Sequence, residues 1–455
     1  MPRSFAAVLL AACLSMAPAT HGAEAPVPKA ALDRELAAIA ADPGYPLAGL
    51  SVLAMRGGRV VYDGQFGRRR IDDANPANDR PVDAATLYRV ASVSKLVTTL
   101  GVMRLVEAGK MDLDRDVSDY LGWRLRNPHF PDDRITARML LTHTASLRDG
   151  AGYFWDRSVR LRDVLEPGGA HHGEGAMWAK NAPPGAYFSY ANLPWGVLGE
   201  AMETVTGERF DRLMKRLVLE PLDVSGGFNP AEFSAAERTN LATLYRKRET
   251  LEGRDIWRSP DGPWYAQVDD YAKEPPIPRA GPDYVPGTNG TLFAPQGGLR
   301  TSAAGLARIM RLLMDGGRLD GKPFLRRETV EAMLARHWRY DPRTRNGDRR
   351  SEEGHANLFN AWGLGNQHFL DLSGDGSGDR LVEGGGFTGV GHLGDAWGLT
   401  ATFAFNRETR DGLIVLIGGV AVDPEKHRGA WSGLYRHEER ILTALWRRAI
   451  RGRED

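Results

Sequence analysis

A serine and a lysine three residues apart are the clearest candidates for chemistry in this sequence. The segment Ser92-Val93-Ser94-Lys95 opens a run of apolar residues that reads as a buried helix. Residues at i and i+3 of a helix lie one above the other, so the Ser92 hydroxyl and the Lys95 amine come within hydrogen-bond reach. A serine hydroxyl is a weak nucleophile until a base takes its proton, and a lysine whose pKa is lowered by burial can be that base. The spacing therefore predicts nucleophilic catalysis at Ser92.

A tyrosine and an asparagine lie at the start of a second predicted helix, over 194–205. Tyr190 and Asn192 follow Pro184-Gly185 and precede this helix. A tyrosine at such a junction can transfer protons where cationic neighbours lower its pKa, and an amide beside it can orient a substrate carbonyl. The alternative is a core tyrosine followed by an asparagine that caps the helix.

A histidine lies in a glycine-rich segment just before a predicted strand. His392 is followed by Leu393 and Gly394. A glycine there lets backbone approach a ligand closely, and an edge strand can donate an N–H group to a developing oxyanion. The alternative is the rim of a hairpin with a solvent-facing histidine.

The elements that position these residues are strands at both ends of the chain and helices between them. The patterns predict a helix over 28–42, strands over 50–55, 59–65, 399–405 and 413–418, and a last helix that includes 441–445. We expect an α+β fold in which one antiparallel sheet is covered by the terminal helices and meets a mostly helical subdomain at a cleft. The domain would span 28–450, with the helical subdomain over about 83–300 and long loops at 150–182 and 250–290.

The composition is that of an ordinary globular enzyme. Hydrophobic residues make up 42% and charged residues 26% of the chain, and the formal net charge is +1. This balance, with no basic stripe, argues against nucleic acid as a partner. No internal stretch approaches the roughly 20 apolar residues that a membrane-spanning helix needs. We therefore expect a small-molecule or peptide substrate.

The three motifs together resemble those of serine β-lactamases and penicillin-binding proteins, and the class C-type β-lactamase-related serine hydrolases in particular. The motifs occur in the family's order: Ser92-Val93-Ser94-Lys95, Tyr190-Ala191-Asn192 and His392-Leu393-Gly394. Supporting segments are similar too: Ile135-Thr136, Leu140-Leu141-Thr142-His143-Thr144, Thr206-Gly207-Glu208, Pro221-Leu222 and Gly297-Gly298-Leu299-Arg300-Thr301-Ser302. The similarity covers about residues 45–420 and implies the β-lactamase/transpeptidase-like fold.

The resemblance also implies roles for three catalytic residues. Ser92 would be the acylated nucleophile and Lys95 its base partner. Tyr190 would transfer a proton to the leaving group. No cofactor is implied.

The substrate-binding residues that the resemblance implies are Asn192, His392, Gly394 and Asp395. Asn192 would hold the substrate amide or carbonyl, and the oxyanion hole would be formed by the backbone N–H groups of Ser92 and Asp395. Class C β-lactamases carry a lysine where His392 stands here, and a neutral imidazole is a weaker counter-ion for a carboxylate at pH 7. This difference favours ester or amide hydrolysis over efficient β-lactam hydrolysis.

We therefore expect an exported serine hydrolase that cleaves an ester or amide through an acyl-enzyme on Ser92. One alternative is a β-lactamase or D,D-peptidase that acts on peptidoglycan stems. Another is a catalytically silent relative that binds a β-lactam or a cell-wall peptide as a signal. His143 is expected to be buried and hydrogen-bonded rather than catalytic. His171-His172 with Glu174 could suggest a metal, but neighbouring histidines diverge, so no metal site is expected.

The N-terminal segment is typical of an export signal. Arg3 precedes an apolar run that begins at Phe5, and small residues follow as far as Ala23. This predicts a signal peptide over 1–23 and a location in a bacterial periplasm or outside the cell. The only cysteine, Cys13, lies within this segment, so the alternative is a lipoprotein signal with a lipid anchor at Cys13.

Overall fold

Strands from both ends of the chain pair in one antiparallel sheet. Among the described residues it has nine strands in the order β12-β13-β14-β15-β16-β17-β1-β2-β3. The strands are β1 (Gly49–Arg56), β2 (Arg59–Arg70), β3 (Arg80–Pro81), β12 (Trp338–Arg339), β13 (Ala361–Trp362), β14 (Gln367–Phe369), β15 (Gly389–Ala396), β16 (Leu399–Phe405) and β17 (Gly412–Ile417). The predicted N-terminal hairpin is β1–β2, and Gly57 and Gly58 in its turn have the positive φ angles (58° and 79°) that glycine adopts without strain.

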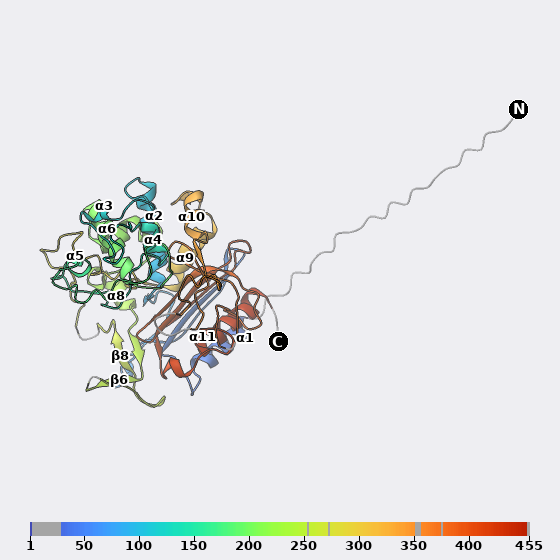
Figure 1. The fold of residues 1–455 in the computed structure, drawn as a ribbon. Coiled ribbons are helices and arrows are strands. Elements are labelled where there is room, and N and C mark those ends of the chain that lie inside the picture. The colour runs from blue at the N-terminus through green and yellow to red at the C-terminus, as the bar shows by residue number, and fades with distance from the viewer. Residues whose placement is uncertain (2–28, 253, 272–273, 351–355, 375, 453–455) are drawn as a thin grey trace.

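Helices cover both faces of this sheet (Figure 1). On one face lie α1 (Lys29–Ala40) and α11 (Arg436–Ala444), which pack against each other. On the other face lie α2 (Val93–Glu107) and α9 (Ala303–Met314). Both faces of the central strands β1, β16 and β17 are therefore buried.

The strand residues alternate between two hydrophobic cores, as the twofold period of a strand requires. On β1, Val52 joins the core that contains α1 and α11, whereas Leu53 joins the larger core of the helical region. On β16 four side chains belong to the larger core: Leu399, Ala401, Phe403 and Phe405. The prediction that these four share one face is confirmed.

The helical region lies between the terminal strands in the sequence and forms a separate layer on the sheet (Figure 1). Its helices are α2 (Val93–Glu107), α3 (Ser118–Leu121), α4 (Ala137–Leu141), α5 (Leu161–Leu165), α6 (Leu193–Thr206), α7 (Phe210–Met214) and α8 (Ala235–Asn240), and α10 (Arg327–Leu334) lies beyond it in the sequence. Helix α2 is buried on nearly all sides, from Val93 to Met103 without interruption. The polar groups at its start therefore lie at the edge of a core.

The prediction of long irregular loops over 150–182 and 250–290 is wrong in part. The first segment contains α5, and the second contains β7 (Arg254–Trp257), β8 (Tyr265–Val268) and the end of β6 (Arg248–Leu251). The other short strands are β4 (Tyr88–Arg89), β5 (Leu244–Arg246), β9 (Arg300–Thr301), β10 (Arg318–Leu319), β11 (Lys322–Pro323) and β18 (Gly419–Val420). The prolines of segment 250–290 lie between and after its strands. Prolines are uncommon inside strands, so the high proline content predicted irregular structure where strands of four residues occur.

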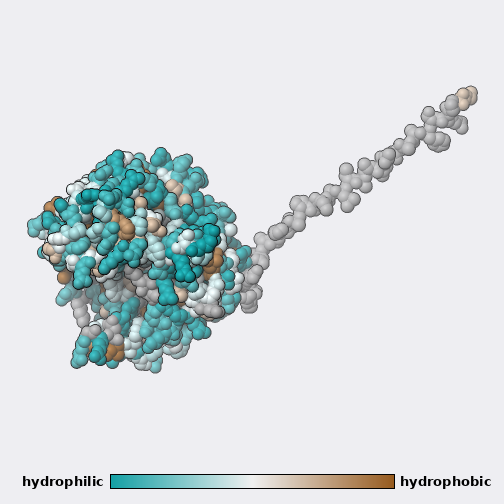
Figure 2. All heavy atoms as spheres, in the orientation of Figure 1, coloured by the Kyte–Doolittle hydropathy of each residue, from teal (hydrophilic) through white to brown (hydrophobic). Residues whose placement is uncertain are grey.

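The computed structural model describes residue 1 and residues 29–252, 254–271, 274–350, 356–374 and 376–452. Apart from Met1, the predicted signal peptide over 1–23 and its Cys13 lie outside the described residues. Hydrophilic residues cover most of the face seen in Figure 2, where apolar residues form small separate patches. None of the helices in the described part of the chain has the length and apolar character needed to cross a membrane.

Candidate active site

Ser92 and Lys95 meet at the start of α2, as their spacing predicts. Ser92 is the N-terminal cap residue of α2, and Lys95 one turn later is wholly buried. The Lys95 Nζ atom donates to Ser92 Oγ at 2.9 Å, to Asn192 Oδ1 at 2.7 Å and to the Gln296 carbonyl at 3.3 Å. Three acceptors therefore fix the amine beside the serine hydroxyl.

A strained turn presents Ser92 at this position. The preceding residue, Ala91, has φ of +43°, a left-handed conformation that residues with a Cβ rarely adopt. Strand β15 lies directly against this turn. A Cβ on Gly394 would be 2.6 Å from the Val90 carbonyl oxygen, so only a glycine allows this approach. At Gly394 the backbone thus approaches the turn that carries Ser92, and the predicted close approach to a ligand stays a prediction.

The start of α6 brings Asn192 to Lys95. Both ends of the Asn192 amide are engaged: Oδ1 accepts from Lys95, and Nδ2 donates to Asp149 Oδ2 at 2.9 Å. Asp149 also accepts from the backbone N–H groups of Asn192 and Leu193 at 2.7 and 2.8 Å. The Asn192 side chain makes no capping hydrogen bond. Asn192 is therefore the N-cap residue of α6 by position, but the Asp149 carboxylate accepts the backbone N–H groups at the helix start in place of its side chain.

Tyr190 is held by aromatic packing above the same amine. The Lys95 Nζ atom lies 4.8 Å from the centroid of the Tyr190 ring. That ring stacks on Phe359, with centroids 4.9 Å apart, and contacts the His143 ring at a tilt of 30°, with centroids 4.4 Å apart. The serine, the lysine, the tyrosine and the asparagine of the first two motifs thus lie together in the fold.

His143 is structural, as predicted. Its ring is buried, and Nδ1 accepts from the backbone N–H of Ala191 at 3.1 Å. Burial and then the charge of Lys95 hold the pKa of His143 well below its usual value of 6.5. The neutral ring fixes the segment between Tyr190 and Asn192.

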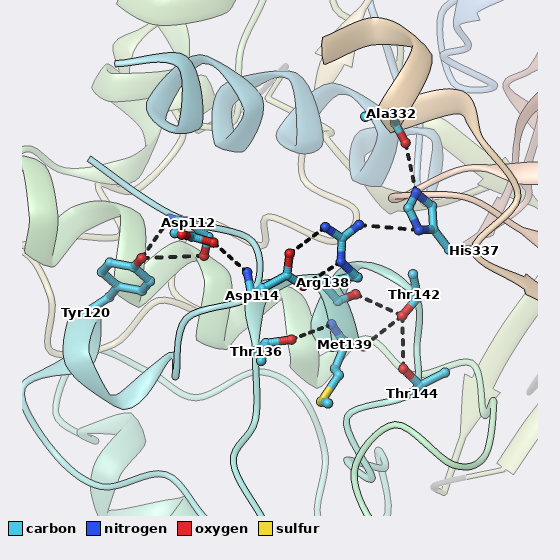
Figure 3. A network of polar contacts seen from close by, with 10 residues as sticks. All are labelled: Asp112, Asp114, Tyr120, Thr136, Arg138, Met139, Thr142, Thr144, Ala332 and His337. Carbon is cyan, nitrogen blue, oxygen red and sulfur yellow. Dashed lines mark hydrogen bonds and ion pairs between the residues drawn. The ribbon is translucent and has the colours of Figure 1, made fainter. Parts of the chain in front are cut away.

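A polar network anchors the helix that leads to His143 (Figure 3). Arg138 on α4 donates to both carboxylate oxygens of Asp114 at 2.7 Å. On its other side it contacts His337 Nδ1 at 3.4 Å, and His337 Nε2 lies 2.8 Å from the Ala332 carbonyl on α10. The network joins α4 to α10, and Figure 3 shows the Thr142 hydroxyl bonded back to the last turn of α4.

His392 is buried, with only 2% of its surface exposed, so the alternative of a solvent-facing histidine is wrong. Its Nδ1 lies 2.6 Å from the Leu393 carbonyl oxygen and therefore carries the proton. Burial, and then the charge of Lys95, lower the pKa of His392 to about 3. The ring is thus neutral at pH 7. Its Nε2 atom is a lone-pair acceptor with no partner among the described residues.

A hollow opens beside Ser92. It is lined by Ser92, Tyr190, Leu358, Phe359, Gln367, His392, Leu393, Gly394, Asp395, Thr400, Leu434, Tyr435 and Glu438. Ser92 and Tyr190 of the predicted site therefore line the same space. Lys95 and Asn192 are not among the lining residues.

Several groups near this hollow were not predicted from the sequence. Asp149 and the Gln296 carbonyl fix the Lys95–Asn192 pair, and Gln367, Tyr435 and Glu438 line the hollow itself. No pattern in the sequence marks them, because each reaches the site from a loop or an element far along the chain. The described residues include no cluster of three or more histidine, cysteine or acidic side chains that could hold a metal.

The fold is that of penicillin-binding proteins and related hydrolases. An octameric penicillin-binding protein homologue from Pyrococcus abyssi has this fold, with a TM-score of 0.58 and 22% sequence identity over 87% of this chain and 74% of that one. EstCE1, a hydrolase with promiscuous acyltransferase activity, has a TM-score of 0.56 and 20% identity over 92% of this chain and 98% of its own. D-amino acid amidase from Ochrobactrum anthropi SV3 has a TM-score of 0.58 and 18% identity over 91% of this chain and 99% of its own. The predicted β-lactamase/transpeptidase-like α+β fold is confirmed.

The model of the Beta-lactamase family matches residues 32–432, and the chain belongs to this family. Among curated relatives, esterase EstB of Burkholderia gladioli is 31% identical over 208 residues, which are 44% of this chain and 50% of that protein. The D-alanyl-D-alanine-carboxypeptidase/endopeptidase AmpH of Escherichia coli K12 is 26% identical over 232 residues, 48% and 54% of the two chains. The chain thus spans about half the length of the curated relatives it matches.

Proposed function

We propose that this protein is a serine hydrolase that cleaves an ester or an amide through an acyl-enzyme on Ser92. The observation that carries the proposal is the 2.9 Å hydrogen bond from Lys95 Nζ to Ser92 Oγ, beside a hollow that Ser92 and Tyr190 both line. A nucleophile within hydrogen-bond reach of a base that is itself held by further groups is typical of covalent catalysis. Membership of the Beta-lactamase family supports it.

Before acylation, Lys95 releases one proton to solvent, and the neutral amine then takes the Ser92 proton while Ser92 Oγ attacks the substrate carbonyl carbon. The backbone N–H groups of Ser92 and Asp395 stabilise the oxyanion. Tyr190 gives its proton to the leaving group as the carbon–oxygen or carbon–nitrogen bond breaks, and Lys95 returns a proton to Tyr190. The acyl group is then on Ser92, and the atom that leaves the acyl carbon carries the proton from Tyr190.

In the deacylation step, water takes the place of the leaving group. Tyr190 and Lys95 accept a proton from this water, whose oxygen attacks the acyl carbon. Ser92 recovers its proton as the acid product leaves, so the protons balance over the cycle. Asn192 holds Lys95 in position through the 2.7 Å bond to Oδ1, and its predicted contact with the substrate carbonyl stays a prediction.

The neutral His392 favours esters or amides without a carboxylate over β-lactams and peptidoglycan stems. A neutral imidazole supplies no full positive charge for a substrate carboxylate. An esterase among the relatives supports the same choice, although carboxypeptidases occur among them too. Export to the periplasm or beyond, with or without a lipid anchor at Cys13, is part of the proposal and is supported by the composition of residues 1–23.

The experiment compares wild type with Ser92→Ala on p-nitrophenyl butyrate and on a fluorescent penicillin. We expect steady ester hydrolysis that falls by at least about 10³-fold in Ser92→Ala, because the nucleophile is lost. Ser158→Ala, at an exposed serine in the 150–182 segment, serves as the matched control and retains activity. Fast penicillin turnover would indicate a β-lactamase, a stable adduct would indicate a peptidase or a sensor, and unchanged hydrolysis in Ser92→Ala would refute the proposal.

A further inference from the structure

One wall of the hollow carries buried polar atoms that the proposed chemistry does not use. Gln367 on β14 is wholly buried, and its Nε2 atom donates to the Leu358 carbonyl at 2.8 Å. Its Oε1 atom has no hydrogen-bond partner among the described residues, and the same is true of His392 Nε2. Both atoms are acceptors. Because an unsatisfied buried acceptor costs free energy, such a pair indicates a ligand that brings hydrogen-bond donors.

Two carboxylates line the same hollow. The Tyr435 hydroxyl donates to Asp395 Oδ2 at 2.9 Å, and the Tyr435 backbone N–H donates to Glu438 Oε2 at 3.1 Å at the start of α11. Burial, and then the negative charge of Asp395, raise the pKa of the Tyr435 hydroxyl, so it stays protonated and continues to donate. Both carboxylates are therefore fixed in place by Tyr435.

The charge around these carboxylates is negative overall. Asp423 and Glu425 add to the negative charge near Asp395 and Glu438, since all four carboxylates act electrostatically on Tyr45 or Tyr435. Two guanidinium groups oppose them: Arg246 interacts with Asp395, and Arg428 pairs with Glu425. These two guanidinium groups and the ammonium of Lys95, whose charge acts on His392, thus offset the four carboxylates only in part. The described residues that line the hollow include no lysine or arginine.

The position of this wall identifies the part of the substrate that it contacts. His392 lies beside Tyr190, with ring centroids 6.3 Å apart. In the proposed mechanism Tyr190 protonates the leaving group, so the leaving group lies against this wall. Leu358, Phe359 and Leu434 add apolar surface to the hollow.

We propose that this wall binds a protonated primary or secondary amine on an apolar stem in the leaving group of the substrate. The acceptors His392 Nε2 and Gln367 Oε1 take N–H hydrogens, and the carboxylates of Asp395 and Glu438 supply the opposite charge. The inference rests on the proposed function in one respect, which is that the ligand is the substrate cleaved at Ser92. It assigns to this site a cationic rather than an anionic leaving group.

The test uses four butanoate esters that differ only at the para position of a phenol leaving group: aminomethyl, methyl, carboxymethyl and trimethylammoniomethyl. We expect kcat/KM to be about tenfold higher for the aminomethyl ester than for the methyl ester, and lowest for the carboxymethyl ester, because the wall attracts positive charge. The trimethylammonium ester has the charge without N–H donors and should fall between the aminomethyl and methyl esters. Equal values for the charged and neutral esters would overturn the inference.

Glu438→Gln tests the wall directly. Glutamine can still accept the capping hydrogen bond from Tyr435, so the start of α11 is retained while the charge is removed. We expect the preference for the aminomethyl over the methyl ester to fall about fivefold. The matched control is Glu408→Gln, at an exposed position between β16 and β17, which should leave the preference unchanged. A preference that is the same in Glu438→Gln and wild type would contradict the assignment.

Binding to Ser92→Ala separates this inference from the proposed function. Calorimetric titration of this variant with the four esters needs no turnover. Tighter binding of the aminomethyl ester to Ser92→Ala, with no Ser92-dependent hydrolysis in wild type, would refute the proposed function and support the cation site. Ser92-dependent hydrolysis with equal binding of all four esters would support the function and overturn the cation site.

Discussion

Two regions of the site differ in how the groups assigned to chemistry and to binding are satisfied by the protein itself: the first wall, at the starts of α2 and α6 behind Ser92, and the second wall, formed by β14, β15 and α11 along the hollow. At the starts of α2 and α6, Lys95 Nζ has three acceptors, and Asp149 fixes the Asn192 amide. On the wall formed by β14, β15 and α11, His392 Nε2 and Gln367 Oε1 have no partner among the described residues. The groups that break bonds are thus held ready in the free protein, whereas the groups that contact the leaving group are completed only by the substrate.

The largest effect is expected from Lys95→Met, which removes the base from the first wall. Methionine fills a similar volume in the core, so the fold should survive, but Ser92 loses the group that takes its proton. We expect kcat for p-nitrophenyl butyrate to fall by about 10³-fold or more. Lys110→Met, at an exposed lysine after α2, is the control. If Lys95→Met kept more than a tenth of the activity, the base would lie elsewhere.

A smaller loss is expected from Asp149→Ala, because Asp149 acts through Asn192 and touches no reacting atom. Removing it leaves three N–H donors without their acceptor and lets the Asn192 amide turn away from Lys95. We expect kcat/KM to fall by about 10²-fold, with partial recovery in Asp149→Asn. The measurement is kcat/KM from pH 5 to 9, since displacing Asn192 should also shift the profile. A lower melting temperature with an unmoved profile would show a structural role alone.

His392→Lys tests the charge preference of the second wall, where His392 lies. The neutral ring is replaced by a cation, so an anionic leaving group should gain and a cationic one should lose. We expect kcat/KM for the carboxymethyl ester, relative to the methyl ester, to rise about tenfold. Faster acylation by a fluorescent penicillin should accompany it. An unchanged ratio would show that position 392 does not contact the leaving group.

The smallest effect on activity is expected from Glu200→Gln, within the helix that supports the first wall. Burial raises the pKa of Glu200 and of Glu203 to about 7. Between about pH 4.5 and 7, these two carboxyl groups are therefore protonated in the folded state but ionised in the unfolded state. The free energy of unfolding that they contribute is fully present below about pH 4.5 and is lost as the pH rises through about 7.

Glu200→Gln cannot titrate, so its free energy of unfolding should fall less between pH 5 and 8 than that of wild type, by up to about 3 kcal/mol. Urea unfolding at both pH values measures this difference, and ester hydrolysis should change less than about twofold. If the free energy of unfolding changed equally with pH in both proteins, the pH dependence would not come from Glu200.

The parts of the site that could be predicted from the sequence are those set by short-range geometry. Ser92 and Lys95 are one helical turn apart, so a local pattern places both. Tyr190 follows from its place before a helix and from the resemblance to a known family. The hairpin at Gly57 and Gly58 and the shared face of β16 follow from turn chemistry and the twofold period in the same way.

The parts that could not be predicted depend on contacts between distant residues. Asp149 meets Asn192 across 43 residues, and Tyr435 meets Asp395 across 40. Neither contact leaves a periodic signal, since loop residues carry no regular pattern. The strands β6, β7 and β8 were missed because they are only four residues long, and because Pro260 and Pro263 lie between β7 and β8.

The most direct test of the central claim is the mass of the protein after a short incubation with p-nitrophenyl butyrate, followed by peptide mapping. Acid quenching traps the intermediate before water removes the acyl group. The account predicts a single butanoyl adduct on the peptide that contains Ser92, formed in wild type and absent in Ser92→Ala. An adduct on another residue, or ester turnover of equal rate in Ser92→Ala, would contradict it.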